Sequence, residues 1–221
     1  IHRGSDLRFG KWPARRIWSF WRYFNKKDER NKLKNDEIKS NEKIYVTKIN
    51  DIELKFYTDN GVFYKNKLDF GTRTLLENLE IDRFKGKILD FGCGYGAIGI
   101  VVSKITNLEV DMLDINKRSI NLARENSKLN HVKTNIFESN IYENVKNKYD
   151  YIISNPPIRV GNEILYKILF EAQEYLNENG QLWIVVNKDQ GAKSLIKKLE
   201  KYYNVNIINR NKGFFVILCL K

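Results

Sequence analysis

The sequence predicts an α/β fold built on a doubly wound, parallel sheet. After Gly86, short runs rich in branched and aromatic residues alternate with longer segments whose apolar residues recur at helical spacing. Such alternation implies βαβ units, with ligands bound at the carboxyl ends of the strands. A glycine-rich turn at 92–96 and an Asn-Pro-Pro turn at 155–157 each follow one of these strands. Both turns are therefore expected at the ligand-binding edge of the sheet.

The individual elements follow in order along the chain. Two β-rich runs, KIYVTKI and IELKFYT, are separated by an Asn-Asp pair and predict a hairpin. A turn at Asn60-Gly61 leads to a helix that begins at about Thr72. Strands are then expected at 87–91, 108–113, 133–138, 149–154, 181–187, 204–209 and 213–220, and helices near 96–105, 116–129, 162–178 and 190–202. A turn at 211–213 predicts that the last two strands form an antiparallel hairpin.

The first 42 residues differ from the rest and are expected to form an extension. Residues 1–24 interleave arginines with aromatic side chains and hold three of the four tryptophans. Such a pattern suits stacking on bases or binding to an anionic membrane, but its unusual composition favours a leader that is not native to the domain. Residues 25–42 are charged, without periodicity, and read as a linker. The domain is expected at 43–221, with a lead-in at 43–85 and the core at 86–221.

Charge and composition narrow the classes of function. The net charge is +12, and residues 1–50 hold 14 Lys and Arg against 6 Asp and Glu. This asymmetry makes nucleic acid the expected polyanionic partner, although basic composition can also serve solubility alone. Two cysteines suit a reducing compartment, so we expect a cytoplasmic protein. Two histidines are too few for a standard zinc cluster, and no metal site is expected. No apolar run is long enough to predict a membrane span.

The turn in LDFGCGYGAIGI is the first motif that points to a ligand. Gly92, Gly94 and Gly96 crowd the turn, where missing side chains let the backbone approach a bound molecule. Gly94, Gly96 and Gly99 also match the G-x-G-x-x-G spacing of a dinucleotide site. A carboxylate at Asp90 would repel a pyrophosphate there, but it suits a ligand with a cationic amine and a sulfonium, such as S-adenosylmethionine. The alternative is an aspartate that caps a turn in a ligand-free unit.

Polar residues end the next two strands. Asp114 lies 20 residues after Gly94, where an acidic side chain accepts hydrogen bonds from ribose hydroxyls. Asn140 follows the third strand and is placed to bond the adenine edge. A helix N-cap is the alternative for Asn140, and for Asp114 an N-cap role would be compatible with binding the ribose. Asp111 is a competing carboxylate, but it lies in mid-strand and is expected to point out of the crevice.

The fourth strand runs into the second motif, Asn155-Pro156-Pro157-Ile158. The prolines fix their own φ, and Pro156 keeps Asn155 out of the helical region. The turn is therefore expected to present the Asn155 side-chain oxygen and the Pro156 carbonyl side by side. Two such acceptors can grip the N–H bonds of a planar amine and aim its lone pair at an electrophilic methyl group. An ordinary Pro-Pro strand exit is the alternative.

The two motifs together resemble class I S-adenosylmethionine-dependent methyltransferases that methylate amines. The closer match is the small-domain group that includes the guanine-N2 methyltransferases of small-subunit ribosomal RNA. This resemblance implies a Rossmann-like sheet of seven strands, the last antiparallel, after a small β-hairpin and helix lead-in. It extends over nearly all of 50–221 and is carried by GVFYKNKLDFGTRTLLE, LDFGCGYGAIGI, DINKRSINLARENS, SNPPIRVGNEILYKILFEAQEYL and GQLWIVVNKDQGA.

The resemblance also implies a role for each matching residue. The methionine end of the cofactor would lie on Asp90 and the glycine turn, the ribose on Asp114 and the adenine on Asn140. The substrate amine would be held by Asn155, Pro156 and Pro157, with Phe63, Asp69 and Ile158 near the substrate. The chain departs from the pattern at Asn140, which is often Asp, and at Ile158, which is often aromatic. The second departure weakens stacking on a flipped base, a role that Phe63 or Tyr64 could take.

The sequence therefore favours methyl transfer to an exocyclic amine, with guanine N2 in small-subunit ribosomal RNA as the first candidate. The reaction would be an in-line displacement without a metal or a covalent intermediate, and Cys93 is interpreted as a buried turn residue. One alternative is methylation of a protein glutamine amide, as in release-factor methyltransferases, although these typically carry Tyr where this chain has Ile158. Another is a methyltransferase-like domain that binds RNA without turnover. The intact motif residues argue against that alternative.

Overall fold

The computed structural model describes residues 43–58, 68–156 and 161–221, all within one compact unit, 41–221. Predictions for residues 1–42, and for Phe63, Tyr64, Pro157 and Ile158, lie outside the described residues. The lead-in consists of β1 (Lys43–Ile49), β2 (Ile52–Thr58), α2 (Phe70–Leu76) and the short 3₁₀ helix η1 (Ile81–Arg83).

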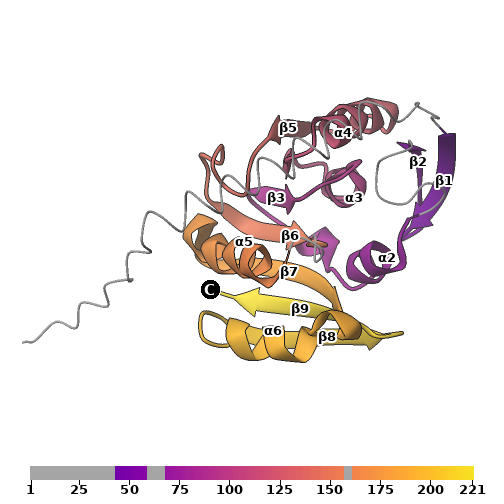
Figure 1. The fold of residues 1–221 in the computed structure, drawn as a ribbon. Helices are drawn as coiled ribbons and strands as arrows, with labels where there is room; N and C mark the ends of the chain where they lie inside the picture. The colour runs from indigo at the N-terminus through magenta and orange to yellow at the C-terminus, as the bar shows by residue number, and fades with distance from the viewer. Residues whose placement is uncertain (1–42, 59–67, 157–160) are drawn as a thin grey trace, which may run out of the picture. The chain divides into compact units, whose positions relative to one another are not determined.

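A seven-stranded sheet forms the centre of the fold, in the order β5-β4-β3-β6-β7-β9-β8 (Figure 1). The five strands from β5 to β7 are parallel, and β9 runs antiparallel to both of its neighbours. The doubly wound sheet with an antiparallel last strand is thus confirmed. The strands are β3 (Ile88–Phe91), β4 (Val110–Asp114), β5 (Thr134–Glu138), β6 (Tyr149–Ser154), β7 (Leu176–Asn187), β8 (Asn204–Asn211) and β9 (Phe214–Leu220).

Helices cover both faces of this sheet. From β3 the strand order runs one way to β4 and β5 and the other way to β6 and β7. Right-handed crossovers therefore place α3 (Ala97–Thr106) and α4 (Lys117–Leu129) on one face, and α5 (Asn162–Tyr175) and α6 (Ala192–Leu199) on the other. The short 3₁₀ helix η3 (Lys188–Gln190) joins β7 to α6. Among the described residues, no helix is long and apolar enough to cross a membrane.

The central strands are buried because helices pack on both sides of them. All four residues of β3 are buried, and Leu89, Ile152 and Ile184 on three adjacent strands are fully inaccessible. Strands of this kind read as continuous apolar runs, which explains why the sequence predicted them well. Asp90 is the one charged residue of β3, and it is fully buried, which is unusual for a carboxylate.

The lead-in hairpin forms as predicted. β1 and β2 pair antiparallel, with Ile49 opposite Ile52. Asn50 and Asp51 have φ of 46° and 63°. Two consecutive left-handed residues are the geometry of a type I′ turn, which Asn and Asp tolerate better than most residues.

The predicted helix 162–178 ends earlier, at Tyr175, and β7 begins at Leu176 rather than at residue 181. Leu176 pairs with Tyr149 of β6, and the register then shifts so that Tyr151 pairs with Gln181. A Cβ atom on Gly180 would lie 2.9 Å from the carbonyl oxygen of Asn177, so this irregularity requires glycine. Gly180 therefore marks a bulge inside the strand and not a break before it.

Candidate active site

The register of the parallel strands aligns the two motifs. Asp90 of β3 is level with Ile153 of β6 and with Met112 of β4. Gly92, Asn155 and Asp114 follow Asp90, Ile153 and Met112, respectively, by two residues. The glycine turn, the Asn-Pro turn and the carboxylate after β4 thus emerge side by side at the carboxyl edge of the sheet. The hydroxyl of Ser154 donates to the carbonyl of Phe91 at 2.8 Å and ties the two strand ends together.

The glycine turn has a backbone that only glycine adopts easily. Gly92, Gly94 and Gly96 have φ of 72°, 57° and 96°. A Cβ atom on Gly96 would lie 2.9 Å from Ile100 Cδ1, whereas one on Gly94 would meet nothing within 4 Å among the described residues. Gly96 is therefore required by packing inside the fold. Beside Gly94 the backbone borders open space, which is where a ligand can approach it.

The Asp90 carboxylate is buried beneath this turn. Its Oδ2 accepts a hydrogen bond of 2.8 Å from the Gly99 N–H of α3, and its Oδ1 has no partner among the described residues. Burial raises the pKa of Asp90 to about 7; the nearby Asp114 charge also raises it, and the Gly99 bond lowers it. A buried oxygen without a partner is costly. Such a site fits a ligand that brings a cationic N–H donor.

Asp114 connects the glycine turn to the start of α4. Its Oδ2 accepts a 2.9 Å hydrogen bond from the Gly94 N–H, and its Oδ1 accepts one of 2.8 Å from Asn116. Burial raises the pKa of this carboxyl, and the backbone bonds oppose the shift. The N-cap of α4 is Asn116, not Asp114, so Asp114 does not cap this helix. Each carboxylate oxygen keeps lone-pair capacity for a hydroxyl donor.

Asn140 and Asp111 have different surroundings. Asn140 lies two residues after Glu138, which is level with Asp114, and its amide donates to Glu143 Oε1 at 3.0 Å. A turn rather than a helix follows Asn140, so it is not a helix N-cap. Asp111 accepts a hydrogen bond of 2.6 Å from the Tyr149 hydroxyl. Its carboxylate therefore holds β4 to β6.

Asn155 has its side-chain amide fixed by two acceptors. Its Nδ2 donates to Asp69 Oδ1 at 3.2 Å and to Thr72 Oγ1 at 2.9 Å. The same Asp69 oxygen caps α2 by accepting from the Thr72 N–H at 2.9 Å. Because a carboxylate accepts and does not donate, the amide nitrogen must face Asp69. The amide oxygen of Asn155 is then left to accept a hydrogen bond from another group.

A second set of contacts, which was not predicted from the sequence, joins the lead-in to α4. Asn126 and Asn130 pair with the free edge of β2: Asn126 bonds the N–H and C=O of Tyr57 at 2.6 and 3.0 Å, and Asn130 bonds those of Lys55 at 3.0 and 2.7 Å. Asn126 also donates to the carbonyl of Tyr95 in the glycine turn at 2.9 Å. Two buried asparagines four residues apart, one in α4 and one at its C-cap, were the available signal.

Tyr95 joins the turn to the hairpin a second time. Its hydroxyl lies 2.9 Å from that of Tyr45, and its ring packs edge-on against Tyr45 and Phe56. Cys93, beside it, is buried, and burial raises the pKa of its thiol. Its burial agrees with the prediction of a buried turn residue, and the raised pKa disfavours the thiolate that nucleophilic attack requires.

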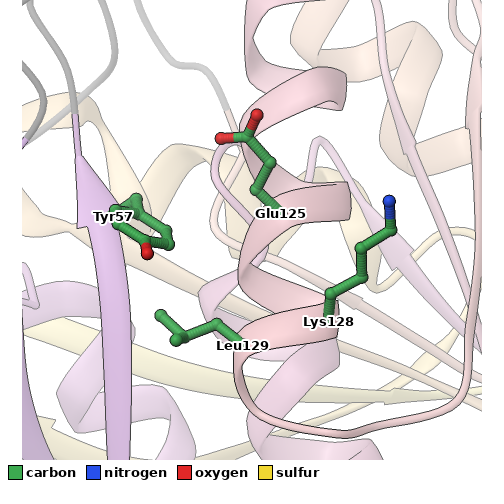
Figure 2. Close-up of a pocket in the computed structure, with 4 residues that line it drawn as sticks. All are labelled: Tyr57, Glu125, Lys128 and Leu129. Carbon is green, nitrogen blue, oxygen red and sulfur yellow. The ribbon is translucent and has the colours of Figure 1, made fainter.

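Two pockets lie outside this constellation. One, of about 520 Å³, lies between β2 and α4 and is lined by Tyr57, Glu125, Lys128 and Leu129 (Figure 2). None of the predicted site residues that the structure describes lines it. The other, of about 480 Å³, lies where α5 and η3 meet, close to the carboxyl end of β7, and includes Asn162, Gln190 and Ser194.

A comparison with protein families decides the class of this domain. The model of the methyltransferase small domain family matches residues 53–218, about three quarters of the chain. The chain belongs to the methyltransferase small domain family. It is accordingly a methyltransferase, and the family resemblance drawn from the sequence is confirmed. The matched range includes the glycine turn and the Asn-Pro turn, but not β1.

The relatives of this chain differ in how much of their own length it matches. Uncharacterized protein YbxB of Bacillus subtilis is 36% identical over 189 residues, which are 83% of this chain and 94% of that protein. Ribosomal RNA small subunit methyltransferase C of Psychromonas ingrahamii is 34% identical over 80% of this chain and 52% of its own length. The chain thus spans about half the length of several methyltransferases that it matches.

A solved structure shares the fold. The T. thermophilus 16S rRNA N2 methyltransferase RsmC, solved in complex with AdoMet and guanosine, superposes with a TM-score of 0.74. It is 22% identical and aligns over 81% of this chain and 50% of its own. A ribosomal protein L11 methylase from Lactobacillus delbrueckii superposes with a TM-score of 0.60.

Proposed function

We propose that the protein transfers a methyl group from S-adenosylmethionine to an exocyclic amine, guanine N2 in small-subunit ribosomal RNA. The observation that carries this proposal is the fixed amide of Asn155, whose nitrogen is committed to Asp69 and Thr72. Its oxygen accepts no hydrogen bond among the described residues and lies at the same sheet edge as the glycine turn, where it is the acceptor that an amine N–H requires. S-adenosylmethionine supplies, when bound, an electrophilic methyl group on a sulfonium sulfur.

The cofactor side of the site consists of residues from three strand ends. Asp90 offers an unpartnered carboxylate oxygen to the cationic amine. Gly92, Gly94 and Gly96 keep side chains out of the space above the turn, and Asp114 and Asn140 serve the ribose and the adenine. Asp114 is already oriented by two backbone N–H groups, so it does not have to reorganise when hydroxyls bind.

The substrate side relies on position rather than on strong acids or bases. The oxygen of Asn155 and the carbonyl of Pro156 accept the two N–H bonds of the amine, and its lone pair is thereby directed toward the methyl carbon. The nitrogen gains the methyl group and releases one proton. Asp69 and Thr72 keep the Asn155 amide from rotating.

The choice of ribosomal RNA rests on the relatives. Several of them are named ribosomal RNA small subunit methyltransferase C, and the T. thermophilus relative is named for N2 methylation of 16S rRNA. A net charge of +12 suits a polyanionic partner. We place the reaction in the cytoplasm, where ribosomal RNA is available.

Two measurements on the same preparation test the proposal. S-adenosylmethionine is titrated calorimetrically into the wild type and into Asp114→Ala, and transfer of a tritiated methyl group to small ribosomal subunits is then measured. We expect binding that is weakened at least ten-fold in the variant, because the ribose loses a charge-assisted partner. Label should enter the RNA. Label in protein would favour a glutamine amide as the substrate, and wild type without cofactor affinity would contradict the proposal.

A further inference from the structure

A group of aromatic and basic side chains lies where β9 contacts α2, the helix that Asp69 caps (both elements are labelled in Figure 1). We call it the tip patch and define it as Phe70, Lys188, Lys212 and Phe214. Phe70 directly follows Asp69, and Phe214 is paired with Asn187 at the carboxyl end of β7. The two rings are 5.6 Å apart between centroids. The tip patch therefore belongs to the same sheet edge as Asn155.

The local backbone holds the tip patch in place. Lys212 and Gly213 have φ of 44° and 86°, which makes a tight two-residue turn. The N–H of Lys188 donates to the carbonyl of Gly213 at 2.7 Å and joins η3 to this turn. A Cβ atom on Gly71 would lie 2.9 Å from Phe214 Cε1, so the Phe214 ring packs directly on the first turn of α2.

The charges of the tip patch are not neutralised within the described part of the chain. Lys188 and Lys212 are exposed, and neither forms an ion pair there with an acidic side chain. The Lys212 ammonium lies 5.3 Å from the centroid of the Phe70 ring. Asp69, the adjacent carboxylate, is buried and already bonded to Asn155 and Thr72. Both rings are only half-buried.

We propose that the tip patch binds single-stranded RNA next to the nucleotide that is methylated. The inference rests on the proposed function and adds the surface that holds the substrate strand. Exposed lysines neutralise phosphates, and partly exposed aromatic rings can stack on any base, which is how single strands are bound without strict sequence preference. The strand would run across the tip patch while the target amine reaches Asn155, two strands away in the sheet.

The test uses the full chain and a fluorescently labelled single-stranded RNA of about ten nucleotides, a length in the range that single-strand binding surfaces span. Binding is measured by anisotropy over a series of salt concentrations. Lys212→Gln should reduce the slope of log affinity against log salt by about 0.7, the contribution of one phosphate contact. Phe214→Leu keeps an apolar side chain but removes the ring, and should weaken binding about five-fold or more.

Lys128→Gln is the matched control, because Lys128 is exposed on α4 in the pocket of Figure 2, away from the sheet edge. It should leave the salt slope at the wild-type value. Wild-type slope and affinity in both tip-patch variants would overturn the inference.

Methyl transfer to small subunits, measured in parallel, separates the two proposals. If the wild type labels RNA while the tip-patch variants bind RNA normally, the inference fails and the proposed function stands. If the wild type labels protein alone, both fail.

Discussion

Asp69 is a residue that serves two elements through one oxygen. Its Oδ1 accepts from the Thr72 N–H at the start of α2 and from the side chain of Asn155 after β6. The sequence suggested Asp69 only through its resemblance to a family, and only as a residue near the substrate. The geometry supports a different role, because its carboxylate oxygen is occupied by the protein itself. We therefore interpret Asp69 as a positioning residue that acts through Asn155.

Replacement of Asp69 should affect turnover more than cofactor binding. In Asp69→Ala the Asn155 amide loses one of its two acceptors, and we expect kcat to fall about ten-fold or more while the affinity for S-adenosylmethionine stays within about two-fold. Asp69→Asn retains an oxygen that can cap α2 and accept from Asn155, so it should recover most of the activity. Equal losses in both variants, or a matching loss of cofactor affinity, would contradict the positioning role.

The buried carboxylate of Asp90 predicts a dependence of stability on pH. Burial raises the pKa of Asp90 to about 7 in the folded state, whereas an exposed aspartate titrates near 4. Between these values the native state binds a proton that the unfolded state lacks, so stability falls as pH rises through this window and levels off above it.

Asp90→Asn isolates this effect because its amide oxygen can still accept from Gly99. Between about pH 6 and pH 8, the cofactor-free wild type should lose about 1 kcal/mol of stability relative to the variant. Urea unfolding at the two pH values measures the difference. A constant difference between wild type and variant would mean that Asp90 is ionised throughout.

Among the elements, α4 and its C-cap supply hydrogen-bond partners to the free edge of the lead-in hairpin. The free edge of β2 would otherwise leave N–H and C=O groups of Lys55 and Tyr57 without partners. The side chains of Asn126 and Asn130 bond these groups in pairs, as a neighbouring strand would. Because Asn126 also bonds the carbonyl of Tyr95, the hairpin and the glycine turn are held by the same side chain.

Asn126→Ala should therefore lower both stability and cofactor affinity. Three buried backbone groups lose their partner, and we expect a loss of about 2–4 kcal/mol in the free energy of unfolding. Cofactor affinity should fall even where the protein is fully folded, since Tyr95 lies between Gly94 and Gly96. Asn121→Ala, at an exposed position on the same helix, is the control. Normal cofactor affinity in folded Asn126→Ala would show that the hydrogen bonds of Asn126 serve stability alone.

For the whole molecule, the sequence predicted the sheet and the two motifs because these depend on local patterns. Short, mostly apolar runs marked β3 and β6, and glycine and proline marked the turns that follow them. Contacts between distant segments were not predictable in this way. The Asn155–Asp69 bond spans 86 positions, and the Asn126–Tyr57 bond spans 69. The early start of β7 was missed because its register depends on Tyr149 of a neighbouring strand.

The alignment of strand ends is what makes the separate motifs into one site. Strand register alone brings Gly92, Asp114 and Asn155 to the same level of the sheet. A methyl donor held at the first two positions and an amine held at the third would then be neighbours. We therefore expect the product to carry its new methyl group on an exocyclic nitrogen.

The most direct test is to identify the methylated nucleoside. Small ribosomal subunits that lack the modification are incubated with the protein and S-adenosylmethionine, and their RNA is digested to nucleosides and analysed by mass spectrometry against standards. We expect N2-methylguanosine, formed by the wild type and lost in Asn155→Ala. A methyl group on a ring carbon or on a ribose oxygen, or product formed equally well by Asn155→Ala, would contradict it.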